Sequence, residues 1–465
     1  MYVRQSAAQA RLVFGRLARP STSPTPSPGS ETYLAETLPT RRATRARHPD
    51  TRSRVMIVIR PERLIIGDGS QSTEGMAVVI EGGRISRVCP SVELGADRDR
   101  VTYVDAAGAS LMPGMIDAHV HLTYDGSPRP LDYKLATLSD SYPALALQAV
   151  RHARDTLRAG VTAVRDLNAP GGVVLALRDA IAAGHVEGPT VVACGQGLSV
   201  TGGHMDKGGW GDHVAFRDLN APCDGPDAFR QGVREQVKRG ADCIKINLCG
   251  GSLRDPNAPY KQEMTDAEVA AAIDEAHRLE RHVAAHTSGG PSVTMAVRAG
   301  LDSVEHGHWI DEQTADLMAE RGTAYVPTLL VNERNYEIGR EALGGSDAGW
   351  AWLDRAREDK WASLERVHRA GATVVMGTDA GFMLPHGSMT ARELELLVHG
   401  GLSAMEAIVS ATSSAARLLG IDAGLVREGA IADLVLVPGD PSRDVRVLQD
   451  LAALRVWRAG REVAA

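Results

Sequence analysis

The sequence contains no apolar run of the roughly 18 residues that a helix needs to span a bilayer, so we expect no membrane-spanning segment. Its five cysteines are scattered, and none belongs to a Cys-x-x-Cys pair, which argues against a disulfide framework and against a cysteine-based zinc module. Reduced thiols in the cytoplasm are the simplest interpretation. The formal net charge is only −7 over 465 residues, and no long basic cluster follows residue 54, so nucleic acid is not an expected partner.

Two further signatures are missing. No Gly-x-Gly-x-x-Gly follows a first strand at the start of a helix, which leaves a doubly wound dinucleotide-binding sheet without support. No short internal repeat and no heptad array occur either, so the sequence does not indicate a repeat protein or a coiled coil.

Residues 1–54 differ in composition from the rest of the chain. They are rich in Arg, Ser, Thr, Pro and Ala, poor in acidic residues, and without persistent hydrophobic periodicity, which predicts a disordered N-terminal extension. A secretory signal is not favoured, because no continuous apolar core is present. The Arg-rich, acid-poor composition also suits an organelle transit peptide, but we prefer the interpretation as a plain extension.

Both ends of the remaining chain have strand-like patterns. Residues 55–110 contain short alternating segments separated by Gly-containing turns, which are typical of a small antiparallel unit. Residues 421–465 repeat this pattern in GAIADLVLVPGD and LRVWRAGREV. We therefore predict that the two ends combine into one small β-sandwich domain.

The pattern changes in residues 111–420, where a short β-branched run is followed by a helical pattern and this unit repeats. Many of the helical stretches end in Gly just before the next run, as expected for a helix stop. Eight runs over about 300 residues predict an α/β fold with a metal-binding (β/α)8 TIM barrel. The runs are LMPGMIDAHVHL, GVTAVRDL, PTVVACG, ADCIKINL, HVAAHT, DSVEHG, TAYVPTL and TVVMGTD.

Histidine and aspartate residues lie at the ends of these runs. His119 and His121 are two apart in an extended segment, so their imidazoles share a face and can bind one metal ion. Since the C-terminal strand ends of such a barrel meet at one rim, His286, His306 and Asp379 are expected beside them. Each has a plainer interpretation: His286 as a hydrogen-bonded core residue, Asp379 as a helix cap, and the neighbour His308 in place of His306.

Lys245 is one of only six lysines and lies in the run CIKINL. Strand alternation turns Ile244 and Ile246 toward the helices and Lys245 into the barrel, where an unpaired ammonium is costly. The lysine could pair with Asp379. Alternatively, a neutral amine that has captured CO₂ is a carbamate, an anionic ligand able to bridge two metal ions.

From about residue 56 to the end, the chain resembles the amidohydrolase superfamily. It is most similar to the imidazolonepropionase-like group, which includes Xaa-Pro and Xaa-Arg/Lys dipeptidases and ochratoxin-type amidases. Residues 1–54 lie outside this resemblance. The similar segments, in order, are PGMIDAHVHL, GVTAVRDL, TGGHMD, ADCIKINLCGG, HTSGG, SVEHGHWID, GTDAG, HGSMTARELELLV and GAIADLVLVPGDP.

The resemblance implies a site with two divalent ions, usually Zn²⁺. One ion would be held by His119, His121 and Asp379, and the other by His286 and His306, with carboxylated Lys245 as the bridge. The likeness also selects His306 over His308. The imidazolonepropionase design resembles a one-metal site without the lysine, so Lys245 favours the dipeptidase-like, two-metal branch.

We therefore expect a metal-dependent hydrolase that cleaves an amide or peptide bond with a metal-bridging hydroxide. Asp379 would transfer the proton to the leaving nitrogen, and His204 would polarise the substrate. The partner would be a small molecule or peptide, such as a dipeptide or an N-acyl amino acid, and a homo-oligomer is expected. The candidate substrate contacts are His204, Lys207, Trp210, Phe382 and His386.

Two other functions compete with this one. A cyclic-amide hydrolase or aminohydrolase on the same barrel would use one metal ion and an unmodified Lys245. A noncatalytic scaffold related to amidohydrolases would be expected to lose ligands, whereas all six are present in this sequence.

Overall fold

A computed structural model of the chain describes residues 56–94, 101–128, 139–206, 220–250 and 261–464. The chain falls into two compact units, Met1–Asp50 and Thr51–Ala465, and all the described residues belong to the second unit. The prediction for residues 1–54 lies outside the described residues.

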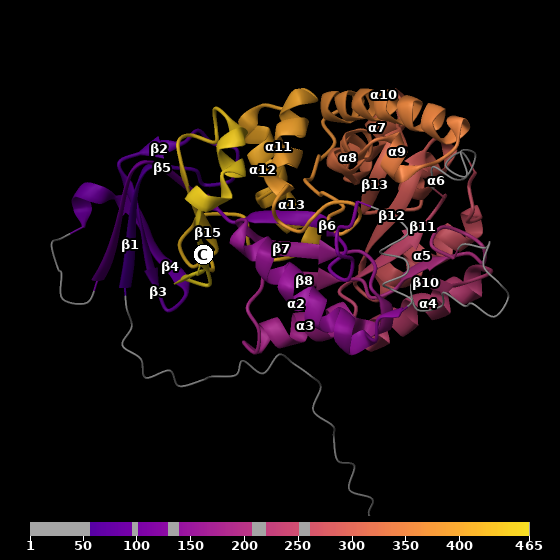
Figure 1. Cartoon of the computed structure of the whole chain (residues 1–465), viewed down its shortest axis with the longest axis horizontal. Helices are drawn as coiled ribbons and strands as arrows, with labels where there is room; N and C mark the ends of the chain where they lie inside the picture. Colours follow the sequence, from indigo (N-terminus) through magenta and orange to yellow (C-terminus); the bar gives the residue numbers. More distant parts are fainter. Residues whose placement is uncertain (1–55, 95–100, 129–138, 207–219, 251–260, 465) are drawn as a thin grey trace, which may run out of the picture. The chain divides into compact units, whose positions relative to one another are not determined.

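The two ends of the second unit share one sheet. Its order is β17-β16-β15-β5-β1-β3-β4, with β2 paired to β1, and β15 runs antiparallel to β5 with Leu436 opposite Leu111 (Figure 1). Strands from the two chain ends thus pair in one sheet, and their organisation as a separate β-sandwich domain stays a prediction. The strands are β1 (Met56–Leu64), β2 (Thr73–Glu74), β3 (Met76–Glu81), β4 (Arg84–Pro90), β5 (Val101–Pro113), β15 (Leu434–Pro438), β16 (Arg455–Arg458) and β17 (Arg461–Glu462).

One strand pair of this sheet contradicts the expectation of an antiparallel unit. β1 pairs with β5 in parallel, with Ile59 opposite Val104. A parallel pair needs a crossover longer than a hairpin turn. The intervening β2, β3 and β4 supply that crossover, which local alternation in the sequence does not reveal.

The central part contains two parallel sheets. The first has the order β6-β7-β8 and the second β10-β9-β11-β12-β13-β14, and every pair within them is parallel. Seven of the eight predicted runs therefore contain a strand, and β9 and β10 were not predicted. The strands are β6 (Met115–Val120), β7 (Val161–Asp166), β8 (Thr190–Ala193), β9 (Gly197–Ser199), β10 (Asn220–Pro222), β11 (Cys243–Asn247), β12 (His282–Gly289), β13 (Ser303–Trp309) and β14 (Ala324–Val326).

The eighth predicted run, residues 373–379, is not a strand, and isolated parallel bridges form within it and at the residue after it. Val374 bridges to Tyr325 of β14, and Ala380 bridges to Val120 of β6. This segment thus lies between an edge strand of each central sheet, and it brings Asp379 close to the end of β6.

Helices connect the strands of the central part (Figure 1). Capping boxes start α5, at Thr265 and Glu268, and α12, at Ser403 and Glu406. Left-handed Gly240 and Gly322 end α4 and α7, as the Gly stops predicted. The helices are α2 (Tyr142–Arg158), α3 (Val173–Ala182), α4 (Pro226–Arg239), α5 (Asp266–Arg278), α6 (Pro291–Arg298), α7 (Glu312–Arg321), α8 (Leu329–Ile338), α9 (Arg340–Leu343), α10 (Asp347–Arg369), α11 (Thr390–His399), α12 (Ala404–Ser410) and α13 (Ser413–Leu419).

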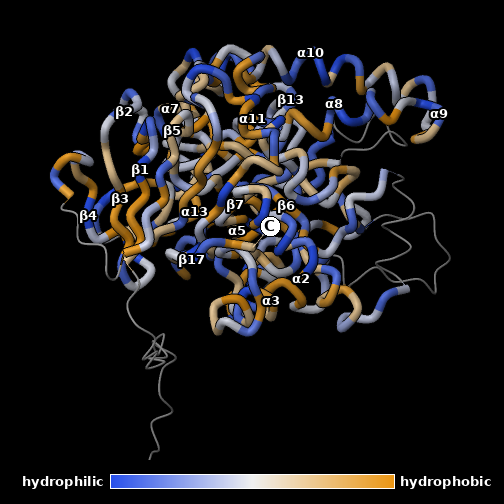
Figure 2. Tube along the Cα trace, turned by 60° about the vertical axis from the view of Figure 1, so that its left-hand side comes forward, coloured by the Kyte–Doolittle hydropathy of each residue, from blue (hydrophilic) through white to orange (hydrophobic). Residues whose placement is uncertain are grey.

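The sheet shared by the two chain ends, here called the end sheet, has an apolar core of its own, while other buried residues of its strands β5, β15 and β16 belong to the core of the central part. Figure 2 shows hydrophobic positions concentrated in strands such as β1 and β3. Leu111, Leu434 and Trp457 pack together on the end sheet, whereas Ile244 and Ile246 belong to the layer between the central strands and the helices. No helix of the described residues is both long and apolar enough to cross a membrane.

The shared sheet generates a stability prediction. Replacement Leu111→Ala should lower the free energy of unfolding by about 2–5 kcal/mol, because Leu111 is fully buried where the two chain ends meet. Leu147→Ala is the matched control at a side chain that is 74% exposed, and it should change stability by less than about 0.5 kcal/mol. Denaturant titration measures both, and equal losses would contradict a core shared by the two ends.

Candidate metal centre

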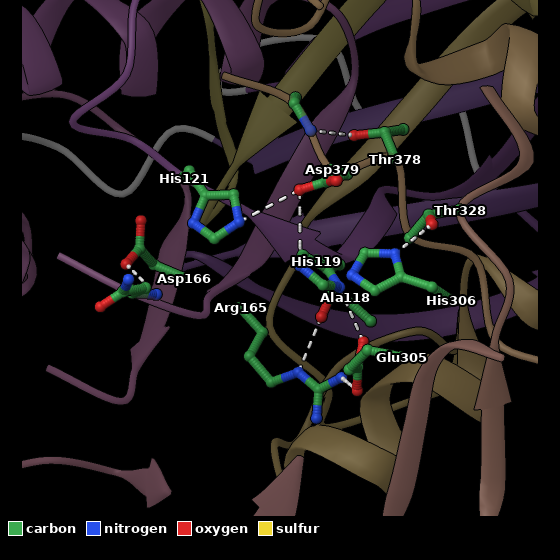
Figure 3. Close-up of polar contacts among 12 residues, drawn as sticks. Ala118, His119, His121, Arg165, Asp166, Glu305, His306, Thr328, Thr378 and Asp379 are labelled. Carbon is green, nitrogen blue, oxygen red and sulfur yellow. Dashed lines mark hydrogen bonds and ion pairs between the residues drawn. The ribbon is translucent and has the colours of Figure 1, made fainter. Parts of the chain in front are cut away.

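Three predicted ligands converge at the end of β6. One ligand atom from each of His119, His121 and Asp379 lies within 4.8 Å of the others. Asp379 Oδ1 is 3.1 Å from His121 Nε2 and 3.5 Å from His119 Nε2, and Figure 3 shows both rings directed toward this carboxylate. Two imidazoles and a carboxylate are suitable ligands for a divalent cation.

Backbone pairing positions Asp379 beside the histidines. Its N–H donates to the His119 carbonyl at 2.8 Å, and its φ of 64° is left-handed, which is uncommon for a residue other than glycine. Buried Asp117 joins the same two segments, because its carboxylate accepts from Thr378 Oγ1 at 2.6 Å and from the Thr378 N–H at 3.0 Å. Burial raises the pKa of Asp117 to about 7.

Lys245 points into the interior, as strand alternation predicted. Ile244 and Ile246 face the helices, whereas Cys243 packs in the apolar cluster on the other side of the strands. Lys245 is 4% exposed, and its Nζ has no hydrogen-bond partner among the described residues. Burial lowers the pKa of this amine, which favours its neutral form. The predicted pairing with Asp379 is thus not formed as a hydrogen bond.

The rings of His286 and His306 lie next to this group. The ring centroids of His286 and His306 are 4.6 Å apart, and those of His119 and His306 are 4.9 Å apart. Burial holds the pKa of His286 and of His306 well below the ordinary value, so both are neutral, the form that binds metals. His306 Nδ1 is 2.7 Å from Thr328 Oγ1, which leaves Nε2 available.

These residues fit a divalent cation. The buried Nε2 of His286 and Nζ of Lys245 lack hydrogen-bond partners among the described residues, and a buried polar atom without a partner is costly. Together with neutral imidazoles and the Asp379 carboxylate, they form a set of nitrogen and oxygen donors typical of metal sites.

Glu305 and Arg165 support this centre and were not predicted. Glu305 Oε2 is 2.8 Å from His119 Nδ1, and Glu305 Oε1 accepts from Arg165 Nη2 at 2.7 Å (Figure 3). Although burial opposes it, Arg165 and His119 lower the pKa of Glu305 to about 2. The carboxylate therefore stays ionised and fixes the Nδ1–H tautomer of His119, with Nε2 toward the site. The available sequence signal was a charged residue within each apolar strand run.

The predicted substrate contacts have different surroundings. His204 stacks on His286 with ring centroids 3.9 Å apart, and Phe382 packs partly buried against Tyr124. His386 is 6% exposed, and its Nε2 is 2.8 Å from the Tyr124 carbonyl oxygen, so its ring holds the backbone that follows His121. Lys207 and Trp210 lie outside the described residues.

Two further buried side chains hold this backbone and were missed. Asp166 accepts from the Leu122 N–H at 2.7 Å, and His152 Nδ1 is 2.8 Å from the Leu122 carbonyl oxygen. The rings of His152 and His386 stack with centroids 4.4 Å apart. Burial raises the pKa of Asp166 to about 6.

A family model described as "Amidohydrolase family" matches residues 110–463 of the chain. The chain belongs to the amidohydrolase family. It is 31% identical over 420 residues to ochratoxinase of Aspergillus niger, covering 86% of this chain and 84% of that protein. Imidazolonepropionase of Streptomyces avermitilis is 27% identical over 405 residues, covering 83% of this chain and 86% of the relative.

Solved amidohydrolase structures agree with this membership. The crystal structure of a Xaa-Pro dipeptidase with bound methionine in the active site superposes with a TM-score of 0.78 at 30% identity, covering 88% of this chain and 100% of the other. The resemblance predicted from the sequence is therefore confirmed. The fold is α/β with parallel sheets and is similar to a TIM barrel.

The Glu305 contact generates a prediction about metal affinity. Replacement Glu305→Gln should weaken Zn²⁺ binding by about 10–100-fold, because the neutral amide no longer compensates Arg165 or holds the His119 tautomer. Competition with a chelator of known affinity measures the change. Glu312→Gln is the control at a side chain that is 75% exposed. Unchanged Zn²⁺ affinity in Glu305→Gln would refute the assignment.

The stacked histidines generate a prediction about pH. Burial, assisted by His152, lowers the pKa of His386 from 6.5 to about 3, so the unfolded state takes up a proton first as the pH falls. The stability of the native state is complete above about pH 6.5 and declines toward pH 3, by about 1.4 kcal/mol per pH unit for this group.

Replacement His386→Gln should remove this contribution, while its amide keeps a donor for the Tyr124 carbonyl. Denaturant unfolding at pH 6, 5 and 4 should therefore show a shallower loss than in the wild type. His185→Gln, at an exposed ring, controls for the loss of a histidine. Parallel wild-type and His386→Gln curves would argue against neutral burial of this ring.

Proposed function

We propose that the chain is a metal-dependent hydrolase that cleaves the carbon–nitrogen bond of an amide or a peptide. Its membership in the amidohydrolase family supports this reaction. The observation that carries the proposal is the convergence of His119, His121 and Asp379 beside nitrogen atoms of Lys245 and His286 that lack hydrogen-bond partners in the described part of the chain.

The proposed cofactor is a pair of divalent ions, most simply Zn²⁺. His119, His121 and Asp379 would hold one ion, and His286 and His306 the other, with Lys245 between them as a carbamate. The lowered pKa of Lys245 supports this, because a neutral amine can add CO₂ and release a proton. When bound, divalent cations supply an activated water at neutral pH and polarise the scissile carbonyl.

Asp379 is the proposed catalytic base. Burial would raise the pKa of its carboxyl group, but His119 and His121 hold the pKa below the ordinary value, so the group is ionised at neutral pH. It can take a proton from the attacking water and deliver it to the leaving nitrogen, which must be protonated to leave. His204, stacked on His286, is the proposed group that polarises the substrate carbonyl.

We propose a dipeptide or an N-acyl amino acid as substrate, in line with the likeness to a Xaa-Pro dipeptidase and to ochratoxinase. Phe382 beside Tyr124 is a proposed substrate contact, as are Lys207 and Trp210 from outside the described residues. The likeness to imidazolonepropionase favours a second candidate, a cyclic-amide hydrolase. A single metal ion and an unmodified Lys245 would indicate that second function.

We also propose that residues 111–420 form a closed (β/α)8 barrel. The bridges of residues 374–380 to β14 and β6, and the hydrogen bond from the Asp242 N–H to the Ala193 carbonyl between β11 and β8, support closure. Residues 55–110 and 421–465 would form the separate β-domain. Homo-oligomerisation and cytoplasmic location stay predictions.

Replacement Lys245→Met tests the proposed function. The variant keeps the side-chain length but cannot form a carbamate, so it should bind fewer than two metal ions and lose at least about a hundredfold in kcat/KM. Elemental analysis gives the metal content, and a panel of dipeptides and N-acyl amino acids gives the activity. Lys238→Met, at an exposed lysine of α4, is the matched control.

Three outcomes separate the candidates. Two metal ions per wild-type chain with amide cleavage support the proposal. One metal ion per chain, with cleavage of a cyclic amide in place of these substrates and full activity in Lys245→Met, supports the cyclic-amide hydrolase. A protein that neither binds metal nor cleaves any of these substrates refutes both functions.

A further inference from the structure

Thr328, at the start of α8, has an unusual backbone conformation. It is fully buried with a left-handed φ of 48° and ψ of 54°. A β-branched residue strongly disfavours this region, so the conformation persists only where surrounding contacts impose it. Strain of this kind is concentrated at functional sites, so the contacts of Thr328 are candidates for a functional role.

Three buried side chains hold Thr328 in place. Its Oγ1 is 2.7 Å from Nδ1 of His306, and its carbonyl oxygen accepts from Lys360 Nζ at 3.0 Å. Lys360 Nζ also lies 3.4 Å from the same hydroxyl oxygen. Glu393 accepts from the backbone N–H groups of the next two residues at 2.8 and 2.7 Å. Elements β13, α10 and α11 thus converge on one residue.

Lys360 and Glu393 are costly to bury. They are 1% and 0% exposed, and among the described residues neither forms an ion pair within 4.0 Å. Burial lowers the pKa of Lys360 to about 7 and raises the pKa of Glu393 to about 8. Replacing buried ionic groups with apolar side chains of similar volume is often neutral or stabilising. Stability alone therefore does not account for this pair.

The hydrogen bonds of Lys360 indicate how this pair can affect the metal site. Lys360 Nζ donates to the Thr328 carbonyl and also to Asn332 Oδ1 of α8 at 2.9 Å, so it fixes the backbone and the side chain around Thr328. His306 Nδ1 can donate to Thr328 Oγ1 or accept from it. When Nε2 binds a metal ion, Nδ1 carries the hydrogen, and Thr328 Oγ1 would accept it with one lone pair while the other faces the Lys360 ammonium. Figure 3 shows the His306 ring between Thr328 and the group of His119 and Asp379.

We propose that Lys360 is a positioning residue that, through Thr328, fixes the orientation and tautomer of His306 for metal binding, with Glu393 anchoring the other side of Thr328. This inference rests on the proposed metal centre. Among the described residues, Lys360 donates to Thr328 and Asn332 and not to the proposed ligands, so its effect should appear in metal affinity as well as in activity.

Variants at Thr328 test the relay. Thr328→Val keeps the side-chain shape but removes the hydroxyl, whereas Thr328→Ser keeps the hydroxyl. Titration with Zn²⁺ against a competing chelator should show one of two ions bound about 10–100-fold more weakly in Thr328→Val. Thr328→Ser should bind close to the wild type. Equal Zn²⁺ affinities in both variants and the wild type would overturn the inference.

Variants at Lys360 separate positioning from folding. Lys360→Met should weaken Zn²⁺ binding as Thr328→Val does. The double variant Lys360→Met/Glu393→Gln removes both buried ionisable groups, so it should regain thermal stability without regaining Zn²⁺ affinity. If affinity returns together with stability, the pair is only structural and the inference is wrong. If Lys360→Met does not fold, the double variant and the two Thr328 variants decide.

The same titration distinguishes this inference from the proposed function. A wild-type protein that binds no Zn²⁺ refutes the metal centre and the inference together. A wild-type protein that binds two ions, with unchanged affinity in Thr328→Val, refutes the inference alone and leaves the metal centre intact.

Discussion

The proposed metal centre depends on the buried ion pair between Arg165 and Glu305, whose Nη2 and Oε1 atoms are 2.7 Å apart. The guanidinium of Arg165 also donates to the Ala118 carbonyl at 2.7 Å and to Ser303 Oγ at 3.0 Å. One cation of β7 therefore connects β6 of the three-stranded sheet with β13 of the six-stranded sheet. The planar guanidinium suits this task because its donors have a fixed geometry. The candidate ligands of both strands are therefore oriented by one rigid contact.

Backbone strain at the centre follows the same principle. His306, Thr328 and Asp379 all have left-handed φ values, of 71°, 48° and 64°, although none is glycine. Such conformations are unfavourable by themselves and are maintained by the surrounding structure. Lys360 donates to the Thr328 carbonyl. Asp117 accepts from the N–H of Thr378, the residue before Asp379. Folding imposes these strained conformations, so the candidate ligand groups are already oriented in the folded protein.

The candidate ligands could be predicted from the sequence, whereas the buried residues that hold them in place could not. Alternation in CIKINL correctly oriented Lys245, because the strand is regular and isoleucines mark its outer face. The contact between Glu305 and Arg165 could not be predicted, because the two residues act through other side chains and lie 140 positions apart in the sequence. Strand order has a similar limit: the parallel β1–β5 pair depends on contacts that a local pattern does not record. The β-branched run at residues 373–379 predicted a strand, but the segment around it forms only isolated bridges.

The pairing of β5 with β15 has a consequence for biosynthesis. Ser110 on β5 bonds to the carbonyl of Gly439, 329 residues later in the chain. At about 5–20 residues per second, a ribosome needs roughly 15–65 seconds to cover that distance. Throughout this interval the nascent N-terminal strands expose an apolar edge without its partner, which is a template for aggregation. Burial of that edge is thus delayed until the last strands emerge, a delay set by the connectivity of the chain.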